Sequence, residues 1–313
     1  MATNPVARST PWPTVSVVVP TFRRPGPLGR CLQSLAQLDY PRDRLEVIVV
    51  DDGGHDLSSA ALAGFAPGVG VRLLVQPANS GPAAARNRGA REASGTLVAF
   101  TDDDCRPRPA WLFDLATAVE EEPSALVGGR VDNALGQNPF AVASQDLVSY
   151  LIGYFPKARS LRPFFTSNNM ACRREAFLRL GGFDESFRFS AGEDRDLSER
   201  WAAEIGPLRH LAGAVVDHHH ELTFRRFVRQ HHYYGRGAVH LARRRHRRGQ
   251  ERPRPEGFGF YGRMLAAPVR HYGWRRGVPV ALLTALSQAA SLTGMLTEIL
   301  WPSLDEGARS PPD

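Results

Sequence analysis

Four short apolar runs divide the first hundred residues, and each ends in a polar or Gly-rich turn. They are "VSVVVP" (15–20), "LEVIVV" (45–50), "VRLLV" (71–75) and "LVAF" (97–100). Continuous apolar runs predict strands of a parallel sheet that is buried on both faces. Helical patterns at 28–38 and 83–93 lie between them. This order predicts an α/β fold, an open and mostly parallel twisted sheet with right-handed crossovers, whose ligands bind outside the carboxyl ends of the strands.

The pattern becomes mixed after about residue 110, and the composition turns basic from Thr223 onward. The run "LARRRHRRGQERPRPEG" (241–257) indicates a boundary or an exposed arm. Residues 278–297 carry no charge and have the length of a membrane span, but Pro279 and several polar residues interrupt them. We therefore expect a packed or membrane-surface helix there, with insertion left open. The predicted organisation is a disordered tail (1–13), a main domain (14–222) and a helical basic extension (223–313).

The amino-acid composition limits the kinds of binding partner and the cellular compartment that we expect for this protein. Hydrophobic content of 42% and charged content of 23% are ordinary for a globular protein, while the net charge of +7 favours an anionic partner. The three cysteines form no CxxC pair, which argues against a disulfide framework or a zinc site and favours a reducing compartment. The first residues lack the apolar core of a secretion signal, so we expect a cytoplasmic location.

The segment "FTDDDCRP" (100–107) places three carboxylates directly after a predicted buried strand. Mg²⁺ and Mn²⁺ prefer oxygen ligands, and they take one or two protein carboxylates together with phosphate oxygens and water. Asp102 and Asp104 form a DxD pair with Asp103 between them. One carboxylate could hold a metal while another holds a ribose. The alternative is a polar loop with an acidic patch.

Two other turns at the same edge of the predicted sheet carry candidate nucleotide contacts. Asp51 and Asp52 follow the second strand, where an acceptor can receive a base N–H or a ribose hydroxyl, or can serve an ordinary turn. The stretch "NSGPAAARNRGA" (79–90) begins a helix whose backbone N–H groups can face an anion. Arg86 and Arg88 add positive charge there, or else lie on the helix surface.

Six segments in order and at about the right spacing resemble glycosyltransferase family 2, whose members have the GT-A fold. They are "VSVVVPTFRRP", "VIVVDDGG", "NSGPAAARNRGA", "FTDDDCRP", "RLGGFDESF" and "GEDRDLSERW". The resemblance covers residues 14–237. It implies an inverting, metal-dependent transfer from a nucleoside-diphosphate sugar (UDP-, GDP- or dTDP-linked) to a hydroxyl of a glycan, a lipid-linked or a small-molecule acceptor. Synthesis of glycans such as cell-envelope polysaccharide is the corresponding expectation.

The resemblance also assigns roles to individual residues. Asp194 is the expected catalytic base and Glu193 its neighbour that orients the loop or the acceptor; helix capping by either acid is the alternative, and it is compatible with catalysis. Asp104 is the expected ligand of Mn²⁺ or Mg²⁺, joined by His218 with His220 as second choice. The expected nucleotide-sugar contacts are Pro20, Thr21, Phe22, Arg23, Asp51, Asp52, Asn79, Gly81, Arg86, Asp102, Asp103 and Asn169. Whether Asp102 or Asp103 contacts the ribose stays open.

The segment "FRRFVRQHHYYGRG" (224–237) interleaves aromatic residues with arginine. That mixture occurs in nucleic-acid-binding proteins, but here it resembles the C-terminal helix of membrane-associated family members. We therefore expect contact with an anionic membrane, peripherally on the inner face of the plasma membrane, and no nucleic-acid partner.

Two other function classes remain to be weighed. A sugar-phosphate nucleotidyltransferase would need a Gly-rich phosphate loop after the first strand, which "PTFRRPGP" matches only faintly. It would also leave the "GED" segment (192–194) unexplained. A non-catalytic module that binds nucleotide sugars or membranes is disfavoured, because the chain retains both the acidic turn and the Glu-Asp pair.

Overall fold

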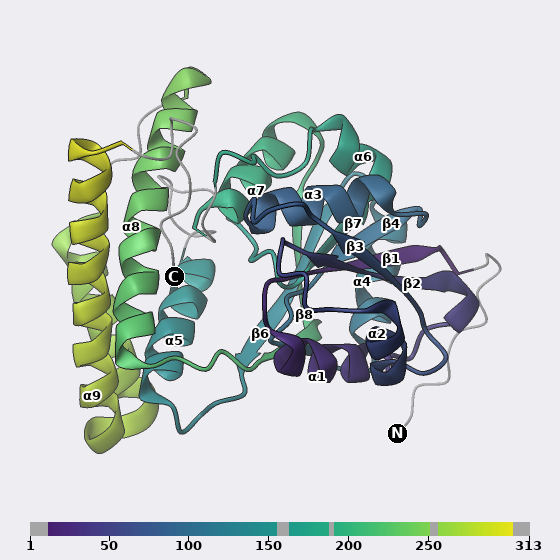
Figure 1. Cartoon of the computed structure of the whole chain (residues 1–313). Helices are drawn as coiled ribbons and strands as arrows, with labels where there is room; N and C mark the ends of the chain where they lie inside the picture. Colours follow the sequence, from purple (N-terminus) through teal and green to yellow (C-terminus); the bar gives the residue numbers. More distant parts are fainter. Residues whose placement is uncertain (1–11, 155–162, 188–190, 251–255, 303–313) are drawn as a thin grey trace.

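The computed structural model describes residues 12–154, 163–187, 191–250 and 256–302 (Figure 1). An eight-stranded sheet with helices on both faces forms the main body, and two long helices stand beside it. The strands are β1 (Val15–Thr21), β2 (Leu45–Asp51), β3 (Gly70–Val75), β4 (Leu97–Phe100), β5 (Cys105–Pro107), β6 (Leu126–Asn133), β7 (Met170–Arg173) and β8 (Leu208–His218). The helices are α1 (Pro25–Leu35), α2 (Ser59–Phe65), α3 (Pro82–Glu92), α4 (Trp111–Glu121), α5 (Pro139–Tyr154), α6 (Arg174–Arg179), α7 (Glu193–Glu204), α8 (Phe224–Arg247) and α9 (Phe258–Leu300), with a 3-10 turn at Arg42–Arg44.

The sheet has the strand order β3-β2-β1-β4-β7-β6-β8-β5. All four strands predicted from the apolar runs are confirmed to within one residue at each end, and they pair in parallel. The second half differs, because β7 is antiparallel to both β4 and β6, and β5 is antiparallel to β8. The sheet is therefore mixed, and its parallel character belongs to the N-terminal half and to the β6–β8 pair.

Prolines and a glycine fix how the first helices meet the sheet. Helices α1 and α3 begin at Pro25 and Pro82, slightly before the predicted starts, because proline suits the first helical turn. A Cβ on Gly89 of α3 would lie 2.4 Å from Val18 Cγ1, so this helix rests directly on β1. Trp12 packs against the rings of Tyr40 and Phe113, so ordered packing already begins within the predicted tail, whose first eleven residues lie outside the described ranges.

The C-terminal extension is helical, as predicted. The basic run expected to be a boundary or exposed arm instead continues α8 as far as Arg247, and residues 251–255 lie outside the described chain. Residues 278–297 fall within α9, which bends at Gly273 where φ is 73°. By length and composition, α9 is the one helix of the described residues that could cross a membrane, although core helices of soluble proteins meet the same criterion.

Helices α8 and α9 lie in close contact through small residues. A Cβ on Gly294 would lie 1.8 Å from the carbonyl oxygen of His232, and a Cβ on Gly235 would lie 1.8 Å from that of Ser291. These two helices therefore pack backbone against backbone, and the contact tolerates no larger side chain.

Gly294→Ala is expected to lower the free energy of unfolding by about 1–3 kcal/mol, because the added methyl group must push the two helices apart. Gly262→Ala is the matched control in the same helix, since a Cβ there has no neighbour within 4 Å. The control is expected to stabilise the protein by about 0.5–1 kcal/mol. Urea unfolding of both variants measures the difference, and equal stabilities would contradict the tight contact.

Candidate active site

The predicted site residues come from loops at the carboxyl ends of β1, β2 and β4, and they meet the start of α7 and the end of β8. Parallel pairing places Thr21 beside Asp51, and the Asp52 N–H donates to the Thr21 carbonyl over 2.9 Å. The antiparallel pairing of β5 with β8 places Cys105 opposite His218. Residues far apart in the sequence are thereby brought to one edge of the sheet.

The three carboxylates of the acidic turn point to three different partners. Asp103 accepts a hydrogen bond from Thr21 Oγ1 at 2.7 Å and forms an ion pair with Arg24 at 2.6 Å. Burial raises the pKa of Asp103 to about 7, and Asp104 adds to the shift while Arg24 opposes it. Arg24 also contacts Asp104 at 3.0 Å, so one guanidinium offsets the repulsion between two adjacent acids.

Asp104 and His218 form the part of the site that fits a divalent cation. The His218 Nε2 lies 3.4 Å from Asp104 Oδ1, and the His218 Nδ1 lies 3.4 Å from Gln145 Oε1. Burial opposes ionisation of Asp104, but His218 and Arg24 outweigh it and hold the pKa of this carboxyl well below its ordinary value. A buried, ionised carboxylate beside an imidazole matches the donor preference of Mn²⁺ or Mg²⁺ when phosphate oxygens complete the shell.

Two neighbours of this pair are less suited to a metal. Cys105 lies close enough for its sulfur to join Asp104 and His218, but burial raises the pKa of its thiol well above the ordinary value, which favours the uncharged form. The His220 ring stacks on that of His218 with centroids 5.0 Å apart, and burial lowers the pKa of His220 to about 4, which keeps its imidazole neutral and able to bind a metal. His218 is still the better placed of the two histidines, because its ligand atom lies within 4.8 Å of those of Asp104 and Cys105.

Arg86 joins the acidic turn to the Glu-Asp pair. Its guanidinium contacts Asp102 at 2.6 Å and Glu193 at 3.3 Å, and its side chain is buried. Arg86 thus lies inside the protein and not on the helix surface. The ion pairs place α3, the acidic turn and the first residues of α7 around one point.

The Glu-Asp pair forms the first two positions of α7. Gly192 occupies the N-cap position with φ of 100° and has no side chain to cap the helix, whereas Asp194 accepts a backbone N–H of the first turn, so the structure supports helix capping by Asp194, which is compatible with a catalytic role. Burial raises the pKa of Glu193 to about 8, and the neighbouring Asp194 adds to the shift. Burial also raises the pKa of Asp194, opposed by Arg195, whose backbone N–H donates to Asp194 Oδ1 over 2.7 Å.

Asp51, the last residue of β2, and Asp52, which follows it, stabilise two different loops. Asp51 accepts the backbone N–H groups of Gly54 and His55 at 2.7 and 2.8 Å, which is turn chemistry. Asp52 accepts hydrogen bonds from Gln76 Nε2, the Ser80 N–H and the Gly81 N–H at 2.6, 2.8 and 2.9 Å. Asp52 therefore fixes the loop that enters α3, and its proposed contact with a nucleotide base stays a prediction.

Asn169 is placed differently from the other predicted contacts. Its Oδ1 accepts from Trp111 Nε1 at 2.8 Å, and its Nδ2 donates to the carbonyls of Arg130 and Ala214 at 2.8 and 3.0 Å. This side chain joins α4, β6 and β8 within the protein. The neighbouring Asn168 contacts Cys105 Sγ at 3.5 Å, next to the candidate metal ligands.

Asn169→Ala is expected to lower the free energy of unfolding by about 2–4 kcal/mol, since it leaves the buried indole N–H of Trp111 without its partner and removes two hydrogen bonds to backbone carbonyls. Asn79→Ala removes an exposed amide from the loop before α3 and is expected to change stability by less than about 0.5 kcal/mol. Thermal and urea unfolding measure both. Equal stability of the two variants would contradict a structural role for Asn169.

Further predicted contacts lie at the end of β1 and directly after it. Pro20 and Thr21 end β1 in buried positions, while Phe22 lies beneath the Arg23 guanidinium, 5.0 Å from ring centroid to Cζ. The sequence interpretation missed Arg24, because the pair "RR" gives no sign of which arginine turns toward the acids. It also missed Tyr234, whose hydroxyl accepts from Gln230 Nε2 at 2.6 Å and lies within electrostatic reach of Asp194.

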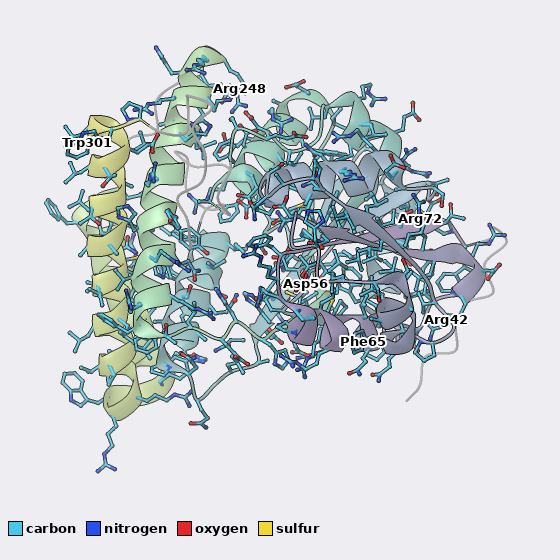
Figure 2. The ribbon with its side chains drawn as sticks, viewed as in Figure 1. Arg42, Asp56, Phe65, Arg72, Arg248 and Trp301 are labelled. Carbon is cyan, nitrogen blue, oxygen red and sulfur yellow. The ribbon has the colours of Figure 1, made fainter. Side chains whose placement is uncertain are left out.

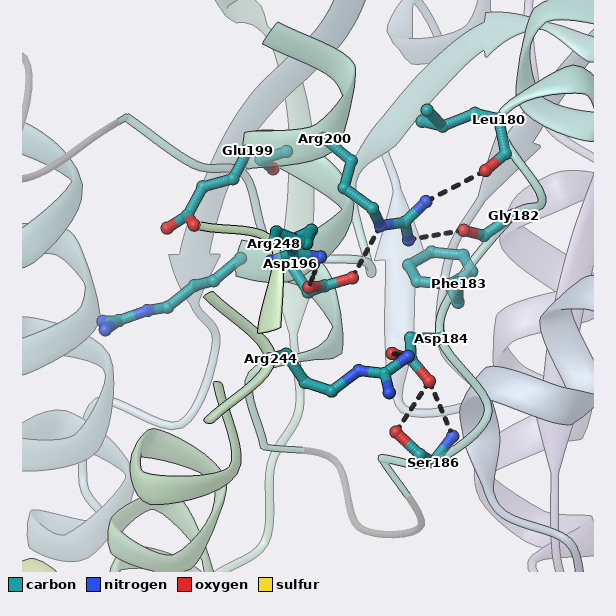
Figure 3. Close-up of polar contacts among 12 residues, drawn as sticks. Leu180, Gly182, Phe183, Asp184, Ser186, Asp196, Glu199, Arg200, Arg244 and Arg248 are labelled. Atoms are coloured by element: carbon teal, nitrogen blue, oxygen red, sulfur yellow. Dashed lines mark hydrogen bonds and ion pairs between the residues drawn. The ribbon is translucent and has the colours of Figure 1, made fainter. Parts of the chain in front are cut away.

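Arginines at the C-terminal end of α8 form ion pairs with α7, which carries the Glu-Asp pair, and with the loop before it (Figure 3). Arg248 contacts the buried Asp196 of α7 at 2.6 Å, and Arg245 forms an ion pair with Glu199 of the same helix. Arg244 pairs with Asp184, whose Oδ1 accepts from Ser186 Oγ at 2.6 Å. The basic run of α8 therefore neutralises acids of the main domain.

The fold and the arrangement of acids define a GT-A-type protein with a candidate sugar-nucleotide site. The sequence model described as "Glycosyl transferase family 2" matches residues 16–181, and the chain belongs to this family.

Curated relatives agree with this assignment. The chain is 34% identical over 235 residues to the pre-mycofactocin glycosyltransferase of Mycobacterium tuberculosis, covering 73% of the chain and 47% of that protein. It therefore spans about half the length of this relative. The chain is also 26% identical over 230 residues to the glycosyltransferase AglE of Haloferax volcanii, and the match covers 73% of the chain and 74% of that protein.

Solved structures share the fold. A mannosyltransferase from Pyrobaculum calidifontis in complex with GDP-Man and Mn2+ superposes with a TM-score of 0.64 at 20% identity, covering 94% of this chain and 91% of that one. TarS 1–349 of S. aureus in complex with UDP-GlcNAc gives a TM-score of 0.54 at 18% identity, covering 88% and 92%. These likenesses establish the GT-A-like architecture.

Proposed function

We propose that the chain is an inverting glycosyltransferase that uses a divalent metal and moves a sugar from a nucleoside-diphosphate sugar to an acceptor hydroxyl. The observation that carries the proposal is the double ion pair of Arg86 with Asp102 and Glu193. It sets the acidic turn suited to a metal diphosphate beside the buried Glu193 and the half-buried Asp194, a pair of acids suited to proton transfer. Family membership supports the reaction class.

Asp104 and His218 would hold Mn²⁺ or Mg²⁺, with oxygens of the diphosphate and water as further ligands. When bound, the cation neutralises negative charge that develops on the leaving nucleoside diphosphate. The complex of the Pyrobaculum protein with GDP-Man and Mn2+ supports this choice. The Asp102 side chain is 30% exposed whereas that of Asp103 is 5% exposed, so Asp102 is the more accessible partner for a ribose hydroxyl.

Asp194 is the proposed base. The acceptor oxygen attacks the anomeric carbon from the side opposite the diphosphate, the bond from that carbon to the phosphate oxygen breaks, and the acceptor proton passes to the Asp194 carboxylate. The raised pKa that burial gives Asp194 makes its carboxylate a stronger base. Glu193 stays against Arg86 and positions the start of α7.

The donor is expected to be a UDP-, GDP- or dTDP-sugar bound over the loop that Asp52 holds, in a cytoplasmic setting. The complexes of the structural neighbours with GDP-Man and UDP-GlcNAc support a nucleotide-sugar donor without selecting one. The acceptor is a hydroxyl of a glycan, a lipid-linked sugar or a small molecule. The loops that bracket residues 155–162 bear on this choice, and those residues lie outside the described ranges.

A donor screen tests the proposal. The protein is incubated with Mn²⁺ and a panel of nucleotide sugars, and release of nucleoside diphosphate is measured with and without a chelator. Metal-dependent release from one donor class is the expected result. If no donor is consumed while a nucleoside triphosphate and a sugar phosphate yield pyrophosphate, the chain is a nucleotidyltransferase and the proposal fails.

A further inference from the structure

The outer face of α9 exposes large apolar side chains (Figure 2). Of the eleven large hydrophobic residues that are exposed in the described chain, eight lie in α9 and Trp301 follows directly after it. Exposed fractions reach 77% for Trp274, 66% for Leu282 and 69% for Trp301. Helix α8 lies between α9 and the main body, so this face points away from the catalytic domain. Soluble proteins rarely gather apolar surface in this way without a partner.

The two faces of α9 carry large apolar residues outside and small or polar residues inside, the reverse of the arrangement usual for a helix of a soluble protein. The side that packs inward carries small and polar residues, including Thr284, Ser287 and Gly294. The outward side carries Leu282, Leu292, Leu296 and Ile299. A helix of a soluble protein turns its large apolar residues inward. Small and polar residues inside with large apolar residues outside are typical of a helix whose outer surroundings are lipid.

The positive charge of α8 and α9 favours contact with anionic lipid. Helix α8 has eight arginines and α9 has four, and Glu298 is the only acid in either helix. Glu298 is buried and paired with Arg236 and Arg243. Residues 277–297 carry no charge, and they are preceded by Trp274 and the exposed Arg275 and followed by Trp301. Tryptophan and arginine at the ends of an apolar surface are suited to lipid headgroups.

We propose that the outer face of α9, from Trp274 to Trp301, lies on the surface of an anionic lipid bilayer with the helix axis in the plane of the membrane. A spanning arrangement would draw α8, which packs along α9 and carries exposed Arg225 and Arg229, into the hydrocarbon. Glu298, the one acid of α8 and α9, is buried and paired, so a second copy of the chain on this face would bring no acid from these helices to meet the arginines. The proposal is independent of the reaction that the main domain catalyses.

Vesicle flotation with the full chain tests the proposal. Binding is expected to vesicles that contain phosphatidylglycerol, and to be weaker for pure phosphatidylcholine and at high salt. The variant L282E/L292E/L296E is expected to reduce the partition coefficient by at least about tenfold, because each change places a charge on the apolar face. V75E, an exposed apolar residue of β3, is the control and is expected to bind like the parent. Equal binding of the triple variant and the parent overturns the proposal.

Tryptophan fluorescence reports which surface touches lipid. Trp111 and Trp201 are buried, whereas Trp274 and Trp301 are exposed. Vesicles should shift the emission to the blue, and W274F/W301F should remove that shift while flotation persists. Release of the bound protein by alkaline carbonate supports the in-plane arrangement, and resistance to release indicates a span and contradicts it. A dimer in solution that ignores vesicles, and that the triple variant converts to a monomer, would assign the face to a second copy instead.

Discussion

Asp194→Asn is expected to lower kcat about 10²- to 10⁴-fold while the Kd for the nucleotide sugar changes little. The amide keeps the size of the carboxylate but cannot accept the acceptor proton, which is the contribution expected from a general base. The backbone hydrogen bond from Arg195 can still be received by the amide oxygen, so α7 should keep its position. Steady-state release of nucleoside diphosphate, together with calorimetric titration of the donor, separates these two effects.

Glu204→Gln is the matched control, because it makes the same carboxylate-to-amide change at the exposed end of the same helix. Its kcat should equal that of the parent. If Asp194→Asn keeps full activity, Asp194 is not the base. Since the donor screen with the parent enzyme is separate, that outcome would leave the reaction class untouched.

His218→Ala and Asp104→Asn should each abolish the gain in nucleoside-diphosphate affinity that Mn²⁺ provides. His218→Ala removes one of the two side chains that face each other at 3.4 Å, and Asp104→Asn replaces the charged carboxylate with a neutral amide, so the cation loses one of its two strong protein ligands. We expect the Kd measured with Mn²⁺ to rise about 10- to 100-fold and the Kd measured without metal to stay the same. Calorimetric titration with and without the cation provides both values.

His219→Ala is the control for this pair of variants. His219 donates its backbone N–H to the Asp104 carbonyl at 2.8 Å, and alanine retains that bond. Its response to Mn²⁺ should match that of the parent. If His218→Ala also retains the full response, His218 is not a metal ligand, and His220 becomes the next residue to test.

The first half of the fold could be predicted because its evidence is local. Continuous valine and isoleucine runs such as 15–20 and 45–50 are strands in almost any surroundings that bury both faces. The mixed half could not be predicted, because β5 is only three residues long and exists through its pairing with β8. No periodicity marks so short a strand, yet this pairing is what carries Asp104 to His218.

The candidate site, too, could be predicted where the evidence is local in the sequence, and could not where it depends on the direction of a side chain. The order of the motifs identified the acidic turn, Arg86 and the Glu-Asp pair, and the structure brings them together. Arg24 and Asn169 were less predictable, since each depends on the direction in which a side chain points. Arg24 turns to the acids while Arg23 covers Phe22, and Asn169 turns away to Trp111. Neighbouring residues of the same type cannot be separated by sequence alone.

The ion pairs that join the end of α8 to α7 affect where the chain can be truncated and how it folds during synthesis. Without α8 and Arg248 directly after it, Asp196 would keep its ion pair with Arg200, and Glu199 would lose the partner supplied by Arg245. A buried ion pair that loses one partner costs about 3–5 kcal/mol, a large part of the net stability of a domain. A fragment that stops before α8 would thus lack an intact folding unit. During synthesis, Glu199 in the helix that holds Asp194 must wait for Arg245, encoded 46 residues downstream, before its buried charge is neutralised.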